Sequence, residues 1–95
     1  MKIPDSVKVG PYMYSVERRD RVTDGSTVYL GRCLLAERKI LLANGYSPDS
    51  EEESFLHEVL HAIDDAWDLD LKESQIKRLS VGILTVLKDN KLLRE

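Results

Sequence analysis

The spacing of hydrophobic and polar residues changes near the middle of the chain. In the first half, short runs rich in β-branched and aromatic residues are separated by turn residues, which is typical of β-strands. These runs cover residues 12–17, 27–35 and 40–43. Asp24-Gly25 favours a tight hairpin turn, and Asn44-Gly45 closes the last run. The pattern predicts a three-stranded antiparallel meander between about residues 7 and 43, with a possible bulge at Gly31.

The second half has helical periodicity. Ser47 can cap a helix and Pro48 suits its first turn, so a first helix is predicted over residues 48–66. Its apolar residues recur at steps of three and four: Phe55, Leu56, Val59, Leu60, Ile63 and Trp67. A similar stripe predicts a second helix over residues 72–89: Ile76, Leu79, Ile83, Leu84 and Leu87. The fold class is therefore α+β, with a three-stranded antiparallel sheet packed on two helices.

Composition narrows the class of protein. The 95 residues suit a single domain, and 42% hydrophobic residues suit a folded one. Cys33 is the only cysteine, so it is interpreted as a small core residue in a reducing, cytoplasmic setting. The net charge of −3 and the lack of a basic stripe argue against nucleic acid as a partner. No apolar run is long enough for a membrane span or a signal peptide, so no membrane partner is expected.

The first predicted helix contains the motif His57-Glu58-Val59-Leu60-His61. Residues four apart lie on one face of a helix, so both imidazoles can reach the same Zn²⁺. Glu58 would lie beside the metal as general base, taking a proton from a zinc-bound water whose pKa zinc lowers to about 7. The alternative is that these are ordinary, partly buried histidines. The spacing of the only two histidines favours metal binding.

A catalytic zinc site usually has three protein ligands, and no third histidine exists. Glu73, which opens the second predicted helix, is the leading candidate. Glu73 could instead complete a capping box with Asp70, and Asp68 or Asp70 could be the ligand. Asp65, one turn beyond His61, is a candidate to accept the second ring N–H of a ligand histidine, and Asp64 a weaker one.

This order of elements resembles the zincin fold, and more narrowly the gluzincin metallopeptidases related to the ImmA/IrrE group of bacteria and phages. The similarity lies in residues 40–44 leading to Phe55-Leu56-His57-Glu58, within about residues 25–90. The resemblance implies a minimal zincin-like core in which His57 and His61 are ligands, Glu58 is the base and Glu73 is the third ligand. Asp65 matches an aspartate that follows the second histidine in thermolysin-like members.

The predicted function is that of a minimal zinc metallopeptidase acting on a peptide or protein. An extended substrate would lie along an edge strand at residues 40–43. Tyr29 and Tyr46 are candidate oxyanion donors, although both also suit packing roles. The alternative is a non-catalytic, zinc-stabilised binding or regulatory protein, whose site a fourth ligand such as Asp65 or Asp68 would close.

Overall fold

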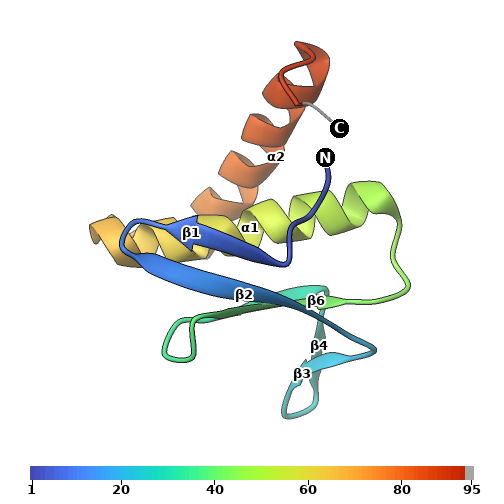
Figure 1. The fold of residues 1–95 in the computed structure, drawn as a ribbon, viewed down its shortest axis with the longest axis vertical. Coiled ribbons are helices and arrows are strands. Elements are labelled where there is room, and N and C mark those ends of the chain that lie inside the picture. Colours follow the sequence, from blue (N-terminus) through green and yellow to red (C-terminus); the bar gives the residue numbers. More distant parts are fainter. Residues whose placement is uncertain (94–95) are drawn as a thin grey trace.

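The computed structural model describes residues 1–93, which form six strands followed by two helices (Figure 1). The strands are β1 Ser6–Val9, β2 Tyr12–Arg19, β3 Val22–Asp24, β4 Thr27–Tyr29, β5 Gly31–Leu34 and β6 Lys39–Ala43. The helices are α1 Pro48–Trp67 and α2 Glu73–Asp89. The α+β class predicted from the sequence is confirmed, and the helices lie close to the predicted ranges.

The predicted three-stranded antiparallel meander is wrong. The main sheet has four strands in the order β1-β2-β6-β5, and β3 and β4 form a separate hairpin. β2 and β6 are parallel neighbours, with Ser15 opposite Lys39 and Arg19 opposite Ala43. The predicted run over residues 27–35 divides into β4 and β5, and Gly31 begins β5 instead of forming a bulge. The Asp24-Gly25 turn is confirmed, since Asp24 pairs with Thr27 across it.

The central strand β6 is covered on both faces, which explains its unbroken apolar sequence. Ile40 and Leu42 belong to the larger core cluster, whereas Leu41 and Ala43 pack with Val22 of the β3–β4 hairpin. Four of the five residues of β6 are buried, all except Lys39. β6 therefore lies inside the sheet, and the predicted edge strand at residues 40–43 is wrong. β5 is the edge strand on this side.

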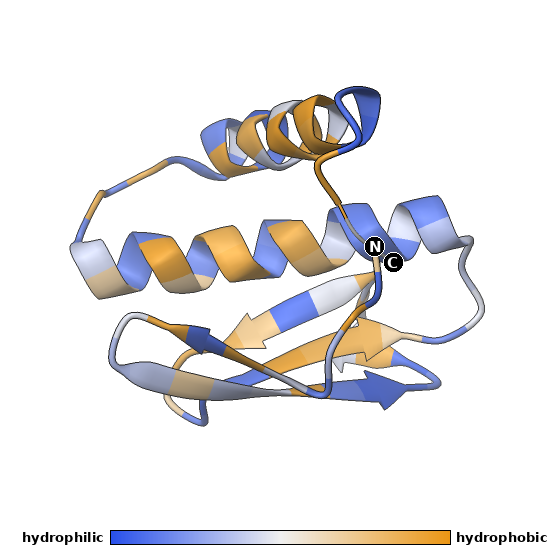
Figure 2. Ribbon diagram, turned by 45° about the horizontal axis from the view of Figure 1, so that its top comes forward, coloured by the Kyte–Doolittle hydropathy of each residue, from blue (hydrophilic) through white to orange (hydrophobic). Residues whose placement is uncertain are grey.

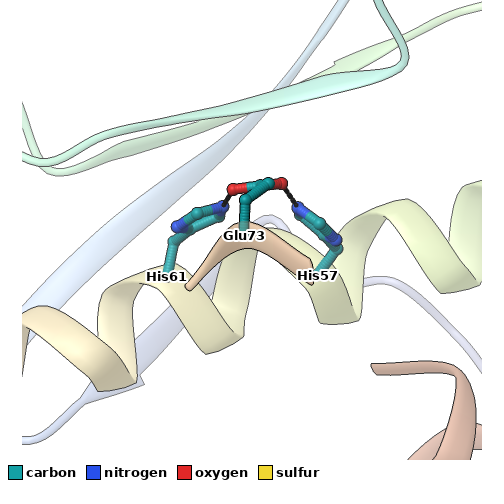
Figure 3. Close-up of side chains that lie close together, drawn as sticks. All are labelled: His57, His61 and Glu73. Carbon is teal, nitrogen blue, oxygen red and sulfur yellow. Dashed lines mark hydrogen bonds and ion pairs between the residues drawn. The ribbon is translucent and has the colours of Figure 1, made fainter. Parts of the chain in front are cut away.

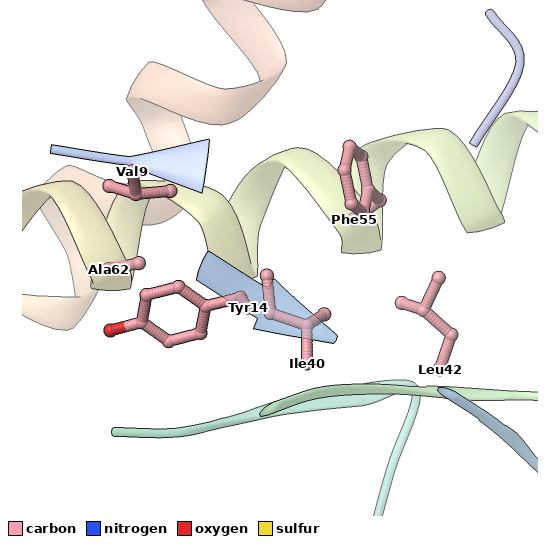
Figure 4. Close-up of a cluster of buried hydrophobic side chains, with 6 residues drawn as sticks. All are labelled: Val9, Tyr14, Ile40, Leu42, Phe55 and Ala62. Carbon is pink, nitrogen blue, oxygen red and sulfur yellow. The ribbon is translucent and has the colours of Figure 1, made fainter. Parts of the chain in front are cut away.

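Helix α1 lies between the sheet and α2 (Figure 2). Its sheet-facing side contributes Phe55 and Ala62 to the larger core cluster (Figure 4). The strands supply the other members of that cluster: Val9, Tyr14, Ile40 and Leu42. α2 packs on α1 and buries Ile76, Ser80 and Leu84. Among residues 1–93, neither helix is long and apolar enough to cross a membrane.

Candidate metal centre

Helix α1 presents His57 and His61 on one side, one turn apart. The helix begins as predicted, because the side chain of Ser47 accepts a hydrogen bond from the Ser50 N–H at 3.2 Å, with Pro48 in the first turn. The two imidazole centroids are 5.0 Å apart. Because α1 is packed on both sides, these rings project from a well-supported helix.

A short, sharply turned link carries the chain from α1 to α2. Asp68 and Asp70 both adopt left-handed conformations, with φ of 52° and 57°, which aspartate tolerates better than most residues. Asp64 accepts a hydrogen bond from the Leu71 N–H at 2.9 Å. Asp64 therefore holds the link that delivers Glu73, a positioning role that the sequence did not indicate.

The predicted capping box between Asp70 and Glu73 is wrong. α2 is capped at Lys72, whose N–H donates to the side chain of Gln75 at 2.8 Å. Gln75 therefore supplies the side chain that reaches back to the start of the helix. This leaves the carboxylate of Glu73 available to groups on α1.

The Glu73 carboxylate lies between the two histidines (Figure 3). One oxygen is 2.7 Å from Nε2 of His57, and the other is 2.9 Å from Nε2 of His61. Donor atoms of the three residues all lie within 4.8 Å of one another. The structure thus brings the three predicted ligands together. No other His, Cys, Asp or Glu among residues 1–93 joins this group.

The three donors fit a zinc ion after a small displacement. Two ligands of a tetrahedral zinc with bonds of about 2.0–2.1 Å lie about 3.3 Å apart. The two nitrogen–oxygen distances here are shorter, whereas the donor atoms as a set spread over up to 4.8 Å, so the imidazoles would have to close in and Glu73 would have to move outward. Its side chain is 68% exposed, whereas those of His57 and His61 are 18% and 29% exposed. The movable group is therefore the carboxylate, and two imidazoles with one carboxylate are a donor set suited to zinc.

Glu58 lies beside this group without belonging to it. It is only 7% exposed, and the backbone N–H of Cys33 on β5 donates to its carboxylate. Burial, aided by the negative charge of Glu73, raises the pKa of Glu58 to about 7. A cation held by the histidines would act in the opposite direction, because positive charge favours the carboxylate.

Asp65, the candidate partner of a histidine ring, pairs with a different residue. Its carboxylate is 3.5 Å from the guanidinium of Arg38, in the turn between β5 and β6. Arg38 also stacks on Tyr12, with 3.6 Å between the guanidinium carbon and the ring centroid, and donates to the Tyr14 hydroxyl at 2.9 Å. Asp65 thus joins α1 to the sheet. Its role behind a ligand histidine stays a prediction.

Two open clefts flank the candidate centre, and His57, Glu58 and Glu73 line both. Tyr29 lines both clefts, whereas Tyr46 lines neither. Arg32 lines the cleft beside His61 and also pairs with Asp24 at 3.8 Å. Arg32 was not predicted as a site residue, because its position depends on the pairing of β5 with β6.

Cys33 lines the same cleft as Arg32 but is a poor candidate ligand. Burial, followed by the charges of Glu58 and Asp65, raises its pKa to about 12. The thiol is therefore protonated at neutral pH, whereas metal ligation requires a thiolate. Cys33 is half-buried against the larger core cluster, close to the core role expected from the sequence.

No protein-family description, curated protein or solved structure matches this chain.

Proposed function

We propose that this protein is a small zinc-dependent metallopeptidase. The observation that carries the proposal is the convergence of His57, His61 and Glu73 within 4.8 Å, with the buried carboxylate of Glu58 beside them in an open cleft. A ligand set of two histidines and one carboxylate leaves a zinc position for water or substrate.

A bound zinc would supply a Lewis acid and an activated water to this cleft. Glu58 follows His57 directly but lies outside the donor group, so its carboxylate is available as a base. In the proposed reaction Glu58 accepts a proton from the attacking water and later passes it to the departing amine. The backbone N–H of Cys33 favours the charged form of this carboxylate, which is the form that acts as a base.

The proposed substrate is an extended peptide that pairs with the free edge of β5. β5 pairs with β6 on one side only, and Gly31, Arg32 and Cys33 line the cleft over the candidate centre. Strand addition at this edge would place a peptide carbonyl near the histidines. Tyr29 and Arg32 lie in the same cleft, and their hydroxyl and guanidinium are donors suited to an oxyanion.

The second candidate function is zinc-stabilised binding without catalysis. It is favoured by the placement of the three donors on two helices, because a metal there would cross-link α1 to α2. A structural zinc usually has four protein ligands. Asp65 pairs with Arg38 and Asp68 ends α1 in a left-handed conformation, so neither belongs to the donor group. Without a fourth protein ligand one zinc position would stay open to water or substrate, and this favours the catalytic function.

Metal content is the first test. Protein purified without a histidine tag should contain about one zinc per chain by elemental analysis, which is the stoichiometry of a single three-residue site. His57→Ala should lose the metal, because one of two imidazole ligands is removed. Glu51→Gln, a carboxylate change on the same helix that lines neither cleft, should keep it. Absence of zinc after incubation with the metal would refute both functions.

Catalysis is the second test, using a library of unstructured peptides read by mass spectrometry. Glu58→Gln should reduce cleavage by at least about 100-fold while zinc stays bound, because the base is lost but the ligands remain. Glu51→Gln, which changes a residue that lines neither cleft, should leave cleavage close to that of the parent protein. Cleavage that survives Glu58→Gln would exclude the proposed base, and zinc binding with no cleavage by the parent protein would favour the binding function.

A further inference from the structure

The outer face of α2 is apolar and uncovered. α2 buries Ile76, Ser80 and Leu84 toward α1, but Leu79, Ile83 and Val86 on its other side are exposed. These three residues and Leu71 line an open groove along the helix. Figure 2 shows the hydrophobic bands on α2, which forms the outermost layer of the fold. No element within residues 1–93 lies over this groove.

Gly82 lies in the middle of that groove. Glycine inside a helix costs about 1 kcal/mol relative to alanine, so it usually has a local reason. Among residues 1–93 no such reason exists: the φ of Gly82 is not positive, and a Cβ added there would meet nothing within 4 Å. A glycine on an exposed apolar helix face allows the backbone of another element to approach closely.

Two charged residues flank the groove without ion-pair partners among residues 1–93. Arg78 lines the groove, and Asp89 lies eleven residues later at the end of α2. Eleven residues correspond to about three turns, so the two side chains lie on the same flank of the helix. A partner helix with the opposite order of charges would pair with both.

We propose that this protein forms a symmetric dimer through antiparallel packing of α2 on α2 of a second copy. A two-fold axis between Gly82 and Ile83 places Leu79 of one copy opposite Val86 of the other. The same axis brings Arg78 of each copy within about 3 Å, along the helix axis, of Asp89 of the other. In a symmetric parallel pair the flanks that carry these charges would lie on opposite sides of the interface, so Arg78 and Asp89 would not meet. Charge complementarity therefore favours the antiparallel arrangement.

The oligomeric state tests this inference independently of metal binding and catalysis. The full chain should show a concentration-dependent mass between monomer and dimer in sedimentation equilibrium. Ile83→Gln should raise the dimer Kd by at least about tenfold, because the dimer buries this side chain twice. Val81→Gln is the matched control: Val81 and Ile83 are 41% and 38% exposed, but Val81 faces away from the groove. Its Kd should not change.

Three further variants test the geometry of the dimer. Arg78→Glu should weaken the dimer, and the double variant Arg78→Glu with Asp89→Arg should restore it, because the charges exchange places across the two-fold axis. Gly82→Gln should raise the thermal stability of the monomer and yet weaken the dimer, since a better helix former now blocks the close approach. Higher thermal stability of the monomer together with a weaker dimer would show that the interface is lost while the fold is intact.

Three results would overturn the proposal. The first is a purely monomeric chain up to about 1 mM, where even a weak dimer would be populated. The second is a dimer whose Kd is insensitive to Ile83→Gln, which would place the interface elsewhere. The third is failure of the Arg78–Asp89 exchange to restore binding, which would exclude the antiparallel register.

Discussion

The two helices differ in how much of the molecule supports them. α1 has the sheet on one side and α2 on the other, and it carries His57 and His61. α2 rests on α1 alone among the major contacts, leaves its outer face uncovered and carries Glu73. The candidate centre therefore joins two ligands on a rigid element to a third on a weakly supported one. A metal ion would add to α2 the support that α1 obtains from packing.

The largest predicted effect comes from zinc itself. Hydrogen exchange should show that zinc protects the first turns of α2 more than the centre of α1, because only α2 depends on the metal for a second attachment. At a free zinc concentration 1,000 times the Kd, protection should rise by up to about 1,000-fold, or about 4 kcal/mol.

His61→Ala provides the control for this experiment. It removes a ligand on α1 while leaving the α1–α2 packing residues unchanged, so adding zinc should no longer protect α2. Equal protection of the two helices by zinc in the parent protein would contradict the proposed difference between them.

Local features of the sequence were sufficient to predict the helices and the histidine motif. Ser47 and Pro48 mark the start of α1, and the spacing of His57 and His61 follows from helix geometry alone. The sheet order was not predictable in the same way, because β2 and β6 are parallel neighbours separated by a hairpin and another strand. Such pairing depends on contacts distant in sequence. The unbroken apolar run over residues 40–43 is typical of a strand covered on both faces, yet it was interpreted as an edge strand.

The third candidate ligand shows where sequence reasoning reached its limit. Glu73 was favoured as the ligand, but a helix cap stayed open as the alternative, because an acid in the first turn of a helix suits both roles. The position at which α2 starts decides between the cap and the ligand role. That position depends on the hydrogen bond from the Leu71 N–H to Asp64 and on the left-handed conformations of Asp68 and Asp70. Aspartate adopts a left-handed conformation only occasionally, so the shape of this link could not be predicted from the sequence alone.

The next largest effect compares a glycine at the start of the packed strand β5 with one on the open face of α2. A Cβ at Gly31 would lie 2.6 Å from Oγ of Ser54 and 3.0 Å from the carbonyl oxygen of Leu41. Gly31→Ala should therefore reduce the free energy of unfolding by about 1–3 kcal/mol. Gly82→Ala should raise it by about 0.5–1 kcal/mol, because nothing obstructs the new methyl group.

Both variants should be unfolded with urea at protein concentrations low enough to keep the chain monomeric. The measured free energy of unfolding then reports on the monomer alone. The two values should have opposite signs. A neutral Gly31→Ala would mean that β5 can move away from α1, and the packing difference between the two regions would then be smaller than the distances indicate.

The smallest effect concerns the far end of α2, where a charged contact ties it to α1. The carboxylate of Glu52, 9% exposed, is 3.1 Å from Nζ of Lys88 and 3.4 Å from the N-terminal amine. Glu52→Gln should lower the free energy of unfolding by about 1–2 kcal/mol and speed hydrogen exchange in the last turns of α2, because Lys88 keeps only Asp49 as a partner.

The control is Glu51→Gln, which breaks the more exposed pair with Arg18 and should lower the free energy of unfolding by under about 0.5 kcal/mol. Equal losses in urea unfolding would mean that the last turns of α2 are held by their apolar contacts, and that the weak support of this helix is confined to the end that carries Glu73.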